Sequence, residues 1–216
     1  MDTAKVEIKP FFISIAVILC LETAAGAATS AISIHPMVFL GFLRLVETCA
    51  LVIISISCGK GLSSIGLSSA QILPGIKKGL IWSLCIGAGA AVVSAVLMAM
   101  HKNPVSLVKT PMPDTQGDLA LFLLVGALIA PVAEEVFFRG ILFGFMRRWG
   151  AVAAIVFSSL IFVLIHPTGS ALPVVQIVGG FLFAVSYETG KSLMTPLVIH
   201  VLGNASIFFL SLMYAG

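Results

Sequence analysis

Three short patterns bring polar residues into the apolar C-terminal half of this chain: PVAEEVFFRG (131–140), FVLIH (162–166) and HVLGN (200–204). A carboxylate beside an imidazole can hold and deprotonate a water molecule. A second imidazole and a carboxamide can donate hydrogen bonds to a developing oxyanion. Together these side chains provide the groups that a hydrolase needs, so hydrolysis is the chemistry that they predict.

The two adjacent glutamates are expected to do different things. Arg139 follows Glu135 by four positions, and residues four apart lie on one face of a helix, so these two are predicted to form an ion pair. Glu134 points about 100° away around the helix and has no partner in its own pattern. Glu134 is therefore predicted to face a polar cavity.

Spacing also predicts that Glu134 and His166 meet. The chain must turn near Gly150, and each of the two residues lies sixteen positions from that glycine. At 1.5 Å per residue, both lie about 24 Å from the turn of an antiparallel helical hairpin. They can therefore stand at the same height on neighbouring helices.

His200 and Asn204 are four apart and share a helix face in the last apolar segment. Tilt of the helices is needed to bring them level with Glu134. A metal site remains an alternative, because two histidines and a carboxylate can bind zinc; its ligands would be Glu134, His166 and His200.

The elements that must position these groups are membrane helices. Of the 216 residues, 59% are hydrophobic and 10% are charged, whereas soluble domains carry about 25% charged residues. The apolar runs are continuous and approach or exceed the roughly 20 residues that cross a bilayer as a helix. We expect an all-α polytopic protein of about seven helices, with segments near 11–33, 37–58, 80–100, 119–138, 151–166, 172–187 and 192–213.

The fourth segment is expected to continue as a helix to about residue 148. The stretch 59–79 is expected to lie as a short amphipathic segment on the membrane surface. We treat the chain as a single integral membrane domain, 1–216, with N-terminal helices in 1–110 and a catalytic core in 115–213.

Basic residues predict the orientation. One side of the membrane receives nine of them: Lys5, Lys9, Lys60, Lys77, Lys78, Arg139, Arg147, Arg148 and Lys191. The other side receives Lys102 and Lys109. Because Lys and Arg are retained on the cytoplasmic side, the N-terminus is predicted to be cytoplasmic.

Three further charges lie in the first two apolar segments. Arg44 and Glu47 are three apart on one helix, and Glu22 lies midway along the preceding segment. Charges at membrane depth usually pair with one another. Arg44 is therefore predicted to bridge the two glutamates and to tie the helices together.

In this order on successive membrane segments, EExxxR, FxxxH and HxxxN resemble the CPBP family of intramembrane proteases. That family includes the type II CAAX prenyl endopeptidases and the bacteriocin-processing or self-immunity proteins of the Abi group. The resemblance implies hydrolysis of a peptide bond in the membrane. It implies Glu134 as the general base with His166 helping it to activate water, and His200 and Asn204 as oxyanion donors.

The resemblance further implies that Glu135, Arg139 and Phe162 support the site, with no metal cofactor; zinc is the alternative. The implied partners are the lipid bilayer and a peptide or protein substrate, such as a prenylated C-terminus or a leader peptide, and no nucleic acid. The expected location is a bacterial or archaeal inner membrane, with the active site open to the cytoplasm. Two other functions fit the composition: a non-proteolytic immunity or scaffold protein, and a small transporter.

Overall fold

The computed structural model describes residues 6–29, 33–166 and 173–214, and every regular element among them is a helix. The long helices are α1 (Ile8–Ala28), α2 (Pro36–Ser57), α3 (Ser69–Ala99), α7 (Ala151–Leu164), α8 (Val174–Gly190) and α9 (Met194–Met213). The all-α prediction is confirmed.

Between α3 and α7 the chain forms one continuous helical rod over Gln116–Trp149. It consists of α4 (Gln116–Leu124), η3 (Val125–Ile129), α5 (Ala130–Glu135), η4 (Val136–Phe143), α6 (Gly144–Met146) and η5 (Arg147–Trp149). Elements η3 and η4 are π-helical. The predicted continuation of the fourth segment to about residue 148 is confirmed.

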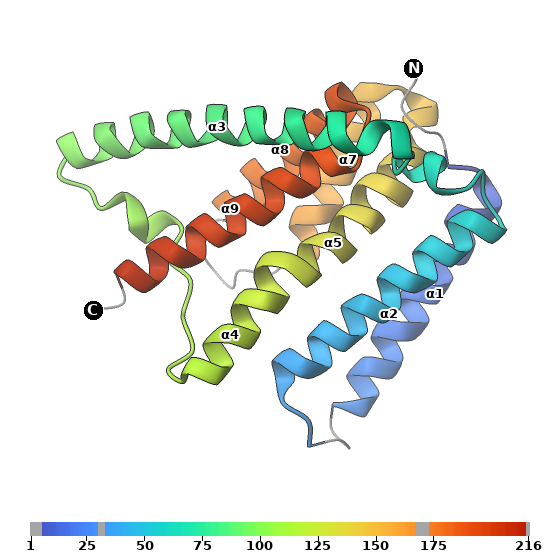
Figure 1. The fold of residues 1–216 in the computed structure, drawn as a ribbon, viewed down its shortest axis with the longest axis horizontal. Coiled ribbons are helices and arrows are strands. Elements are labelled where there is room, and N and C mark those ends of the chain that lie inside the picture. The colour runs from blue at the N-terminus through green and yellow to red at the C-terminus, as the bar shows by residue number, and fades with distance from the viewer. Residues whose placement is uncertain (1–5, 30–32, 167–172, 215–216) are drawn as a thin grey trace.

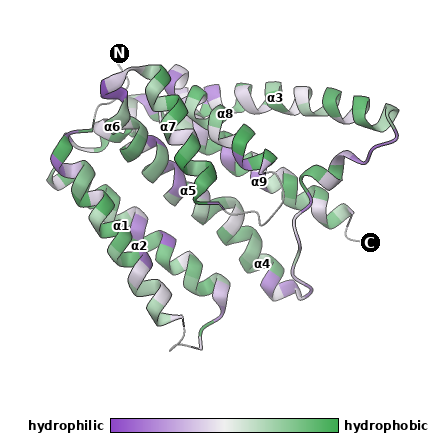
Figure 2. Cartoon of the chain, turned by 180° about the vertical axis from the view of Figure 1, so that it is seen from behind, coloured by the Kyte–Doolittle hydropathy of each residue, from purple (hydrophilic) through white to green (hydrophobic). Residues whose placement is uncertain are grey.

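Five helical stretches are long and apolar enough to cross a membrane: Ile8–Ala28, Pro36–Ser57, Leu62–Ala99, Gln116–Trp149 and Met194–Met213. Together with two shorter apolar helices, α7 and α8, they make seven apolar helical segments among the described residues, as the sequence predicted. Apolar side chains face outward on all of them, Leu84 with 75% exposure among them, as a lipid-facing surface requires. Figure 2 shows these mainly hydrophobic helices and the hydrophilic loop that leads from α3 to α4. The chain is an integral membrane protein.

One boundary differs from the prediction. The third apolar segment was expected from residue 80, but α3 begins at Ser69, after a short 3-10 helix η1 (Leu62–Ile65). Residues 69–79 therefore belong to α3, and the location of 59–79 on the membrane surface stays a prediction. Gly75 and Gly79 pack directly against α9, and this tertiary contact keeps the stretch helical despite Pro74.

The arrangement surrounds the Gln116–Trp149 rod. In Figure 1 the hairpin of α1 and α2 lies on one side of α4 and α5, and α9 lies on the other. Helices α7 and α8 pack against each other and contact η4, while α3 packs along α9. The buried core gathers around η4 and includes Phe138, Phe143 and Tyr187. The rod is therefore the element against which all the site helices are fixed.

The orientation prediction counted Arg139 among the basic residues at one membrane surface, and the structure does not place it there. Its side chain is fully buried within η4, so it does not belong to a membrane-surface loop. Lys5 lies outside the described residues. The other seven basic residues of that side include Lys60, Arg148 and Lys191 at helix ends, so the charge asymmetry remains.

Candidate active site

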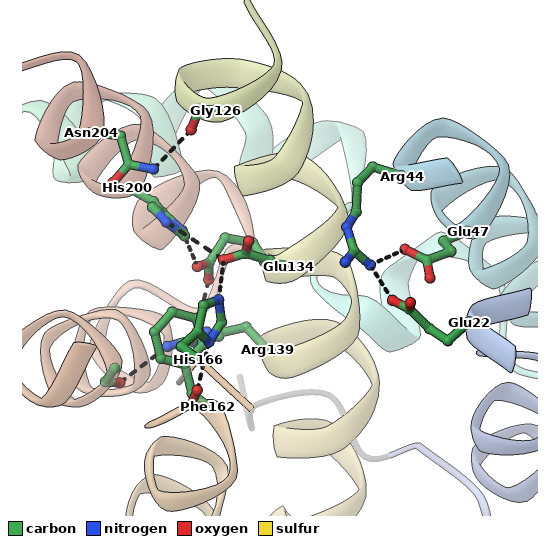
Figure 3. Close-up of polar contacts among 12 residues, drawn as sticks. Glu22, Arg44, Glu47, Gly126, Glu134, Arg139, Phe162, His166, His200 and Asn204 are labelled. Atoms are coloured by element: carbon green, nitrogen blue, oxygen red, sulfur yellow. Dashed lines mark hydrogen bonds and ion pairs between the residues drawn. The ribbon is translucent and has the colours of Figure 1, made fainter. Parts of the chain in front are cut away.

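The Glu134 carboxylate lies between two imidazoles. Its Oε2 atom is 3.7 Å from His166 Nε2 and 3.7 Å from His200 Nε2. Glu134 belongs to α5 and His200 to α9, and His166 lies two residues beyond the end of α7. Figure 3 shows the three side chains converging. Glu134 and His200 are 66 positions apart in the sequence. The three side chains nevertheless converge in the structure, as their spacing predicted.

The hairpin after α5 explains why Glu134 and His166 meet. Gly150 adopts φ +104, a conformation that favours glycine, and it separates η5 from α7. The two arms then run back along each other with Glu134 and His166 equally far from the turn. Their equal distances from Gly150 are thus consistent with the 3.7 Å separation of Glu134 Oε2 and His166 Nε2.

Glu135 and Arg139 pair along the rod as predicted. Arg139 Nε lies 3.3 Å from Glu135 Oε2, and both side chains are completely buried. Arg139 also donates from Nη2 to the Gly180 carbonyl of α8 at 3.1 Å. Its guanidinium carbon lies 4.8 Å from the ring centroid of Phe162 and 5.2 Å from that of Phe183. The cation is therefore held by one carboxylate, one carbonyl and aromatic faces.

Glu135 has a second partner that the sequence did not predict. Its Oε1 atom lies 2.8 Å from His200 Nδ1. Because an ionised carboxylate only accepts hydrogen bonds, His200 carries a hydrogen on Nδ1 and directs Nε2 toward Glu134. The two adjacent glutamates thus contact opposite edges of one imidazole.

His166 is oriented in the same way by its own helix. Its Nδ1 atom lies 2.7 Å from the Phe162 carbonyl, which can only accept. His166 Nε2 is therefore the edge that faces Glu134. Phe162 supports the site twice, through this carbonyl and through the ring that contacts Arg139.

Asn204 is placed differently from the other three residues. It lies on the His200 face of α9, but its Nδ2 atom donates to the Gly126 carbonyl of η3 at 2.9 Å. Figure 3 shows this amide directed toward the backbone above Glu134. One of its two amide hydrogens is thus engaged by the protein itself.

Two contributors to the site come from α8 and were missed. Gly180 accepts from Arg139, and Phe183 stacks on the His200 ring with centroids 4.3 Å apart. The Gly180 backbone is approached closely by Phe162, since an added Cβ would lie 3.1 Å from that ring. A glycine and an apolar aromatic in an apolar helix give no polar pattern that could have marked them.

The charges of α1 and α2 form a separate cluster beside the site. Arg44 Nη1 lies 2.8 Å from Glu22 Oε1 and 2.5 Å from Glu47 Oε2. The predicted tie between the two helices is confirmed. Arg44 makes no hydrogen bond to Glu134, yet its charge is close enough to act on both Glu134 and His166.

Exposure separates Glu134 and His166 from Glu135 and Arg139. The Glu134 and His166 side chains are 20% and 29% exposed, whereas those of Glu135 and Arg139 are 0%. A substrate can therefore approach Glu134 and not the ion pair behind it. Among the described residues, no three His, Cys, Asp or Glu side chains are grouped to hold a metal ion. The metal-free site and the zinc alternative both stay predictions.

Comparison with known proteins places this geometry in context. Residues 116–206 match the family model described as type II CAAX prenyl endopeptidase Rce1-like, and this range contains all three motifs. It lies within the predicted core, 115–213. No solved structure matches the chain.

Two curated relatives are similar over part of their length. The membrane-embedded CAAX protease MroQ of Staphylococcus aureus (strain USA300) is 27% identical over 143 residues, 57% of this chain and 58% of MroQ. YdiL of Bacillus subtilis (strain 168), named as a membrane peptidase, is 29% identical over 100 residues, 46% of this chain and 41% of YdiL. The matches thus span less than two thirds of either relative. The resemblance drawn from the three motifs is confirmed: residues 116–206 are similar to the Rce1-like, type II CAAX prenyl endopeptidases.

Proposed function

We propose that this protein is a glutamate-dependent intramembrane endopeptidase with Glu134 as its general base. The observation that carries the proposal is the equal 3.7 Å separation of Glu134 Oε2 from two imidazole Nε2 atoms. These separations are too long for direct hydrogen bonds and suit a bridging water molecule. The family match and the protease names of the two relatives support the same activity.

The first step is attack by water. A water molecule held by Glu134 and His166 donates a proton to the Glu134 carboxylate while its oxygen bonds to the carbonyl carbon of the scissile peptide. The Phe162 carbonyl keeps His166 from rotating, so its Nε2 edge stays directed at the water. Positioning of this kind removes much of the entropic barrier to attack.

The negative charge that develops on the peptide oxygen is then stabilised by His200 and Asn204. For His200 to donate from Nε2, it must carry a hydrogen on both ring nitrogens, and the Glu135 carboxylate accepts the one on Nδ1. Asn204 donates its second amide hydrogen. When the intermediate collapses, the carbon–nitrogen bond breaks and the proton on Glu134 passes to the leaving amine.

The excess of basic residues on one side supports a cytoplasmic N-terminus. The site is proposed to open to the cytoplasm of a bacterial or archaeal cell. In Figure 1, α1 begins at the same end of the molecule as α3. Lys60 pairs with Glu7, the residue that precedes α1. The substrate proposed is a peptide or protein at the membrane, with a prenylated C-terminus or a leader peptide as the two chemical classes to test.

The experiment compares membrane-associated peptides from cells that carry either the wild type or Glu134→Gln. A proteolytic role predicts precursors that accumulate only with the variant. If Glu134→Gln and His166→Ala cells keep the wild-type phenotype and peptide profile, the protein acts by binding, as an immunity or scaffold protein would. Carboxylate-dependent flux in liposomes without cleavage would instead indicate a transporter.

A further inference from the structure

A carbonyl without a helical partner lies in the rod above Glu134. In η3 the Ala130 N–H bonds the Val125 carbonyl, five residues earlier, in the π-helical pattern. The next donor in that pattern would be residue 131, which would bond Gly126. Residue 131 is proline and has no N–H. The α-helical donor to Gly126 would be the Ala130 N–H, which bonds Val125 instead, and the π-helical donor is absent because residue 131 is proline. The Gly126 carbonyl therefore has no donor within its own helix.

Asn204 supplies the missing donor. Its Nδ2 atom lies 2.9 Å from the Gly126 oxygen. A carbonyl can only accept a hydrogen bond, so the NH2 side of the carboxamide must face it, and the plane of the amide is fixed. Gly126 is half-buried, and backbone carbonyls withdrawn from water are almost always paired, so Asn204 supplies a partner that the helix does not.

Gly126 also permits the close approach of α9. A Cβ atom at this position would lie 3.1 Å from Phe208 Cε2, one turn beyond Asn204. The Phe208 ring packs on Phe122 of α4 with centroids 4.8 Å apart. The packing of Phe208 in α9 against Gly126 and Phe122 therefore helps to hold the Asn204 amide against the Gly126 carbonyl.

We propose that Pro131 is a positioning residue that fixes the Asn204 amide through the Gly126 carbonyl. By withholding an N–H, Pro131 commits one Nδ2 hydrogen to the backbone and leaves the other directed to the substrate carbonyl oxygen. Pro131 is fully buried and stands three residues before Glu134 on the same helix. This inference rests on the proposed endopeptidase function.

The variant Pro131→Ala tests the proposal, because alanine supplies the N–H that Gly126 lacks. Asn204 then competes with a backbone donor for this carbonyl, and its amide is held less firmly. We expect kcat to fall about tenfold with KM unchanged, and Asn204→Ala alone to lower kcat about a hundredfold. In the Asn204→Ala background, Pro131→Ala should lower kcat no further, because it acts through the amide.

Pro74→Ala is the matched control. Pro74 lies inside α3, is exposed, and also gains a helical N–H on replacement, but does not face Gly126. Its kcat should equal that of the wild type. An unfolding midpoint of Pro131→Ala close to the wild-type value would show that the kinetic effect is not loss of fold. If Pro131→Ala reduces kcat by the same factor with and without Asn204, the proposal is overturned.

A second measurement does not depend on activity. Side-chain amide hydrogen exchange of ¹⁵N-labelled Asn204 should show one protected hydrogen in the wild type and none in Pro131→Ala. Equal protection in both proteins overturns the inference. If the wild type cleaves no peptide, the endopeptidase proposal fails, while this exchange measurement still decides whether Pro131 fixes the amide.

Discussion

His200 Nδ1 lies 2.8 Å from Oε1 of Glu135, so the second glutamate of the pair orients the imidazole that faces the first. The same carboxylate balances the fully buried Arg139 cation. The Glu135 side chain thereby links the buried Arg139 cation to His200, the imidazole that faces Glu134. This link gives the first prediction.

Replacing Glu135 by Gln should reduce both activity and stability. The amide oxygen can still accept from His200, but the hydrogen bond loses the charge of the carboxylate, and kcat should fall about a hundredfold. Arg139 would be left as a buried cation without a counter-ion, which destabilises proteins by about 3 kcal/mol. Stopped-flow cleavage and thermal unfolding in detergent measure the two effects. Wild-type kcat in a folded Glu135→Gln variant would contradict the assigned link.

Replacing Arg139 by Lys tests the role of the planar guanidinium. Lysine keeps the charge but cannot reach Glu135 and the Gly180 carbonyl together, and it loses the stacking with Phe162 and Phe183. The free energy of unfolding should fall by about 2 kcal/mol, with a smaller loss of kcat than in Glu135→Gln. Unchanged stability would mean that the carbonyl and ring contacts contribute little.

The Arg44 cluster predicts a compensating pair of substitutions. Arg44→Gln leaves Glu47, which is 2% exposed, without its cation. Stability should fall by about 2 kcal/mol, less than for a fully buried pair because the Arg44 side chain is 26% exposed. Adding Glu47→Gln should restore most of the loss. Additive losses in the double variant would argue against a stabilising ion pair between Arg44 and Glu47.

Metal removal tests the cofactor prediction. Incubation with a strong chelator should leave the cleavage rate unchanged, because Glu134 activates water without a metal in the proposed mechanism. A loss of activity that zinc restores would favour the alternative in which Glu134, His166 and His200 are ligands. A chelator saturated with calcium controls for effects on the detergent or lipid.

Much of this site could be predicted from residue spacing alone. A four-residue spacing on one helix face predicts the Glu135–Arg139 pair, and equal distances from Gly150 predict that Glu134 and His166 meet. These relationships are local to one helix or one hairpin. They need no knowledge of how the other helices pack.

The contacts that could not be predicted all depend on packing between helices. The Glu135–His200 bond needs the position of α9 on α5, and the Phe183 stack needs α8. The turn of the Asn204 amide depends on the π-helical register of η3, which no residue spacing reveals. The early start of α3 at Ser69 likewise follows from its glycine contacts with α9.

The most direct test of the account is the cleavage rate of purified Glu134→Gln in lipid, measured beside Glu7→Gln. Glu7 is an exposed glutamate paired with Lys60 at 3.2 Å, so its replacement should change neither fold nor rate. The account predicts that Glu134→Gln, folded as judged by its unfolding midpoint, loses cleavage by about 10³-fold or more. Cleavage by folded Glu134→Gln at the rate of Glu7→Gln would contradict the assignment of Glu134 as the base.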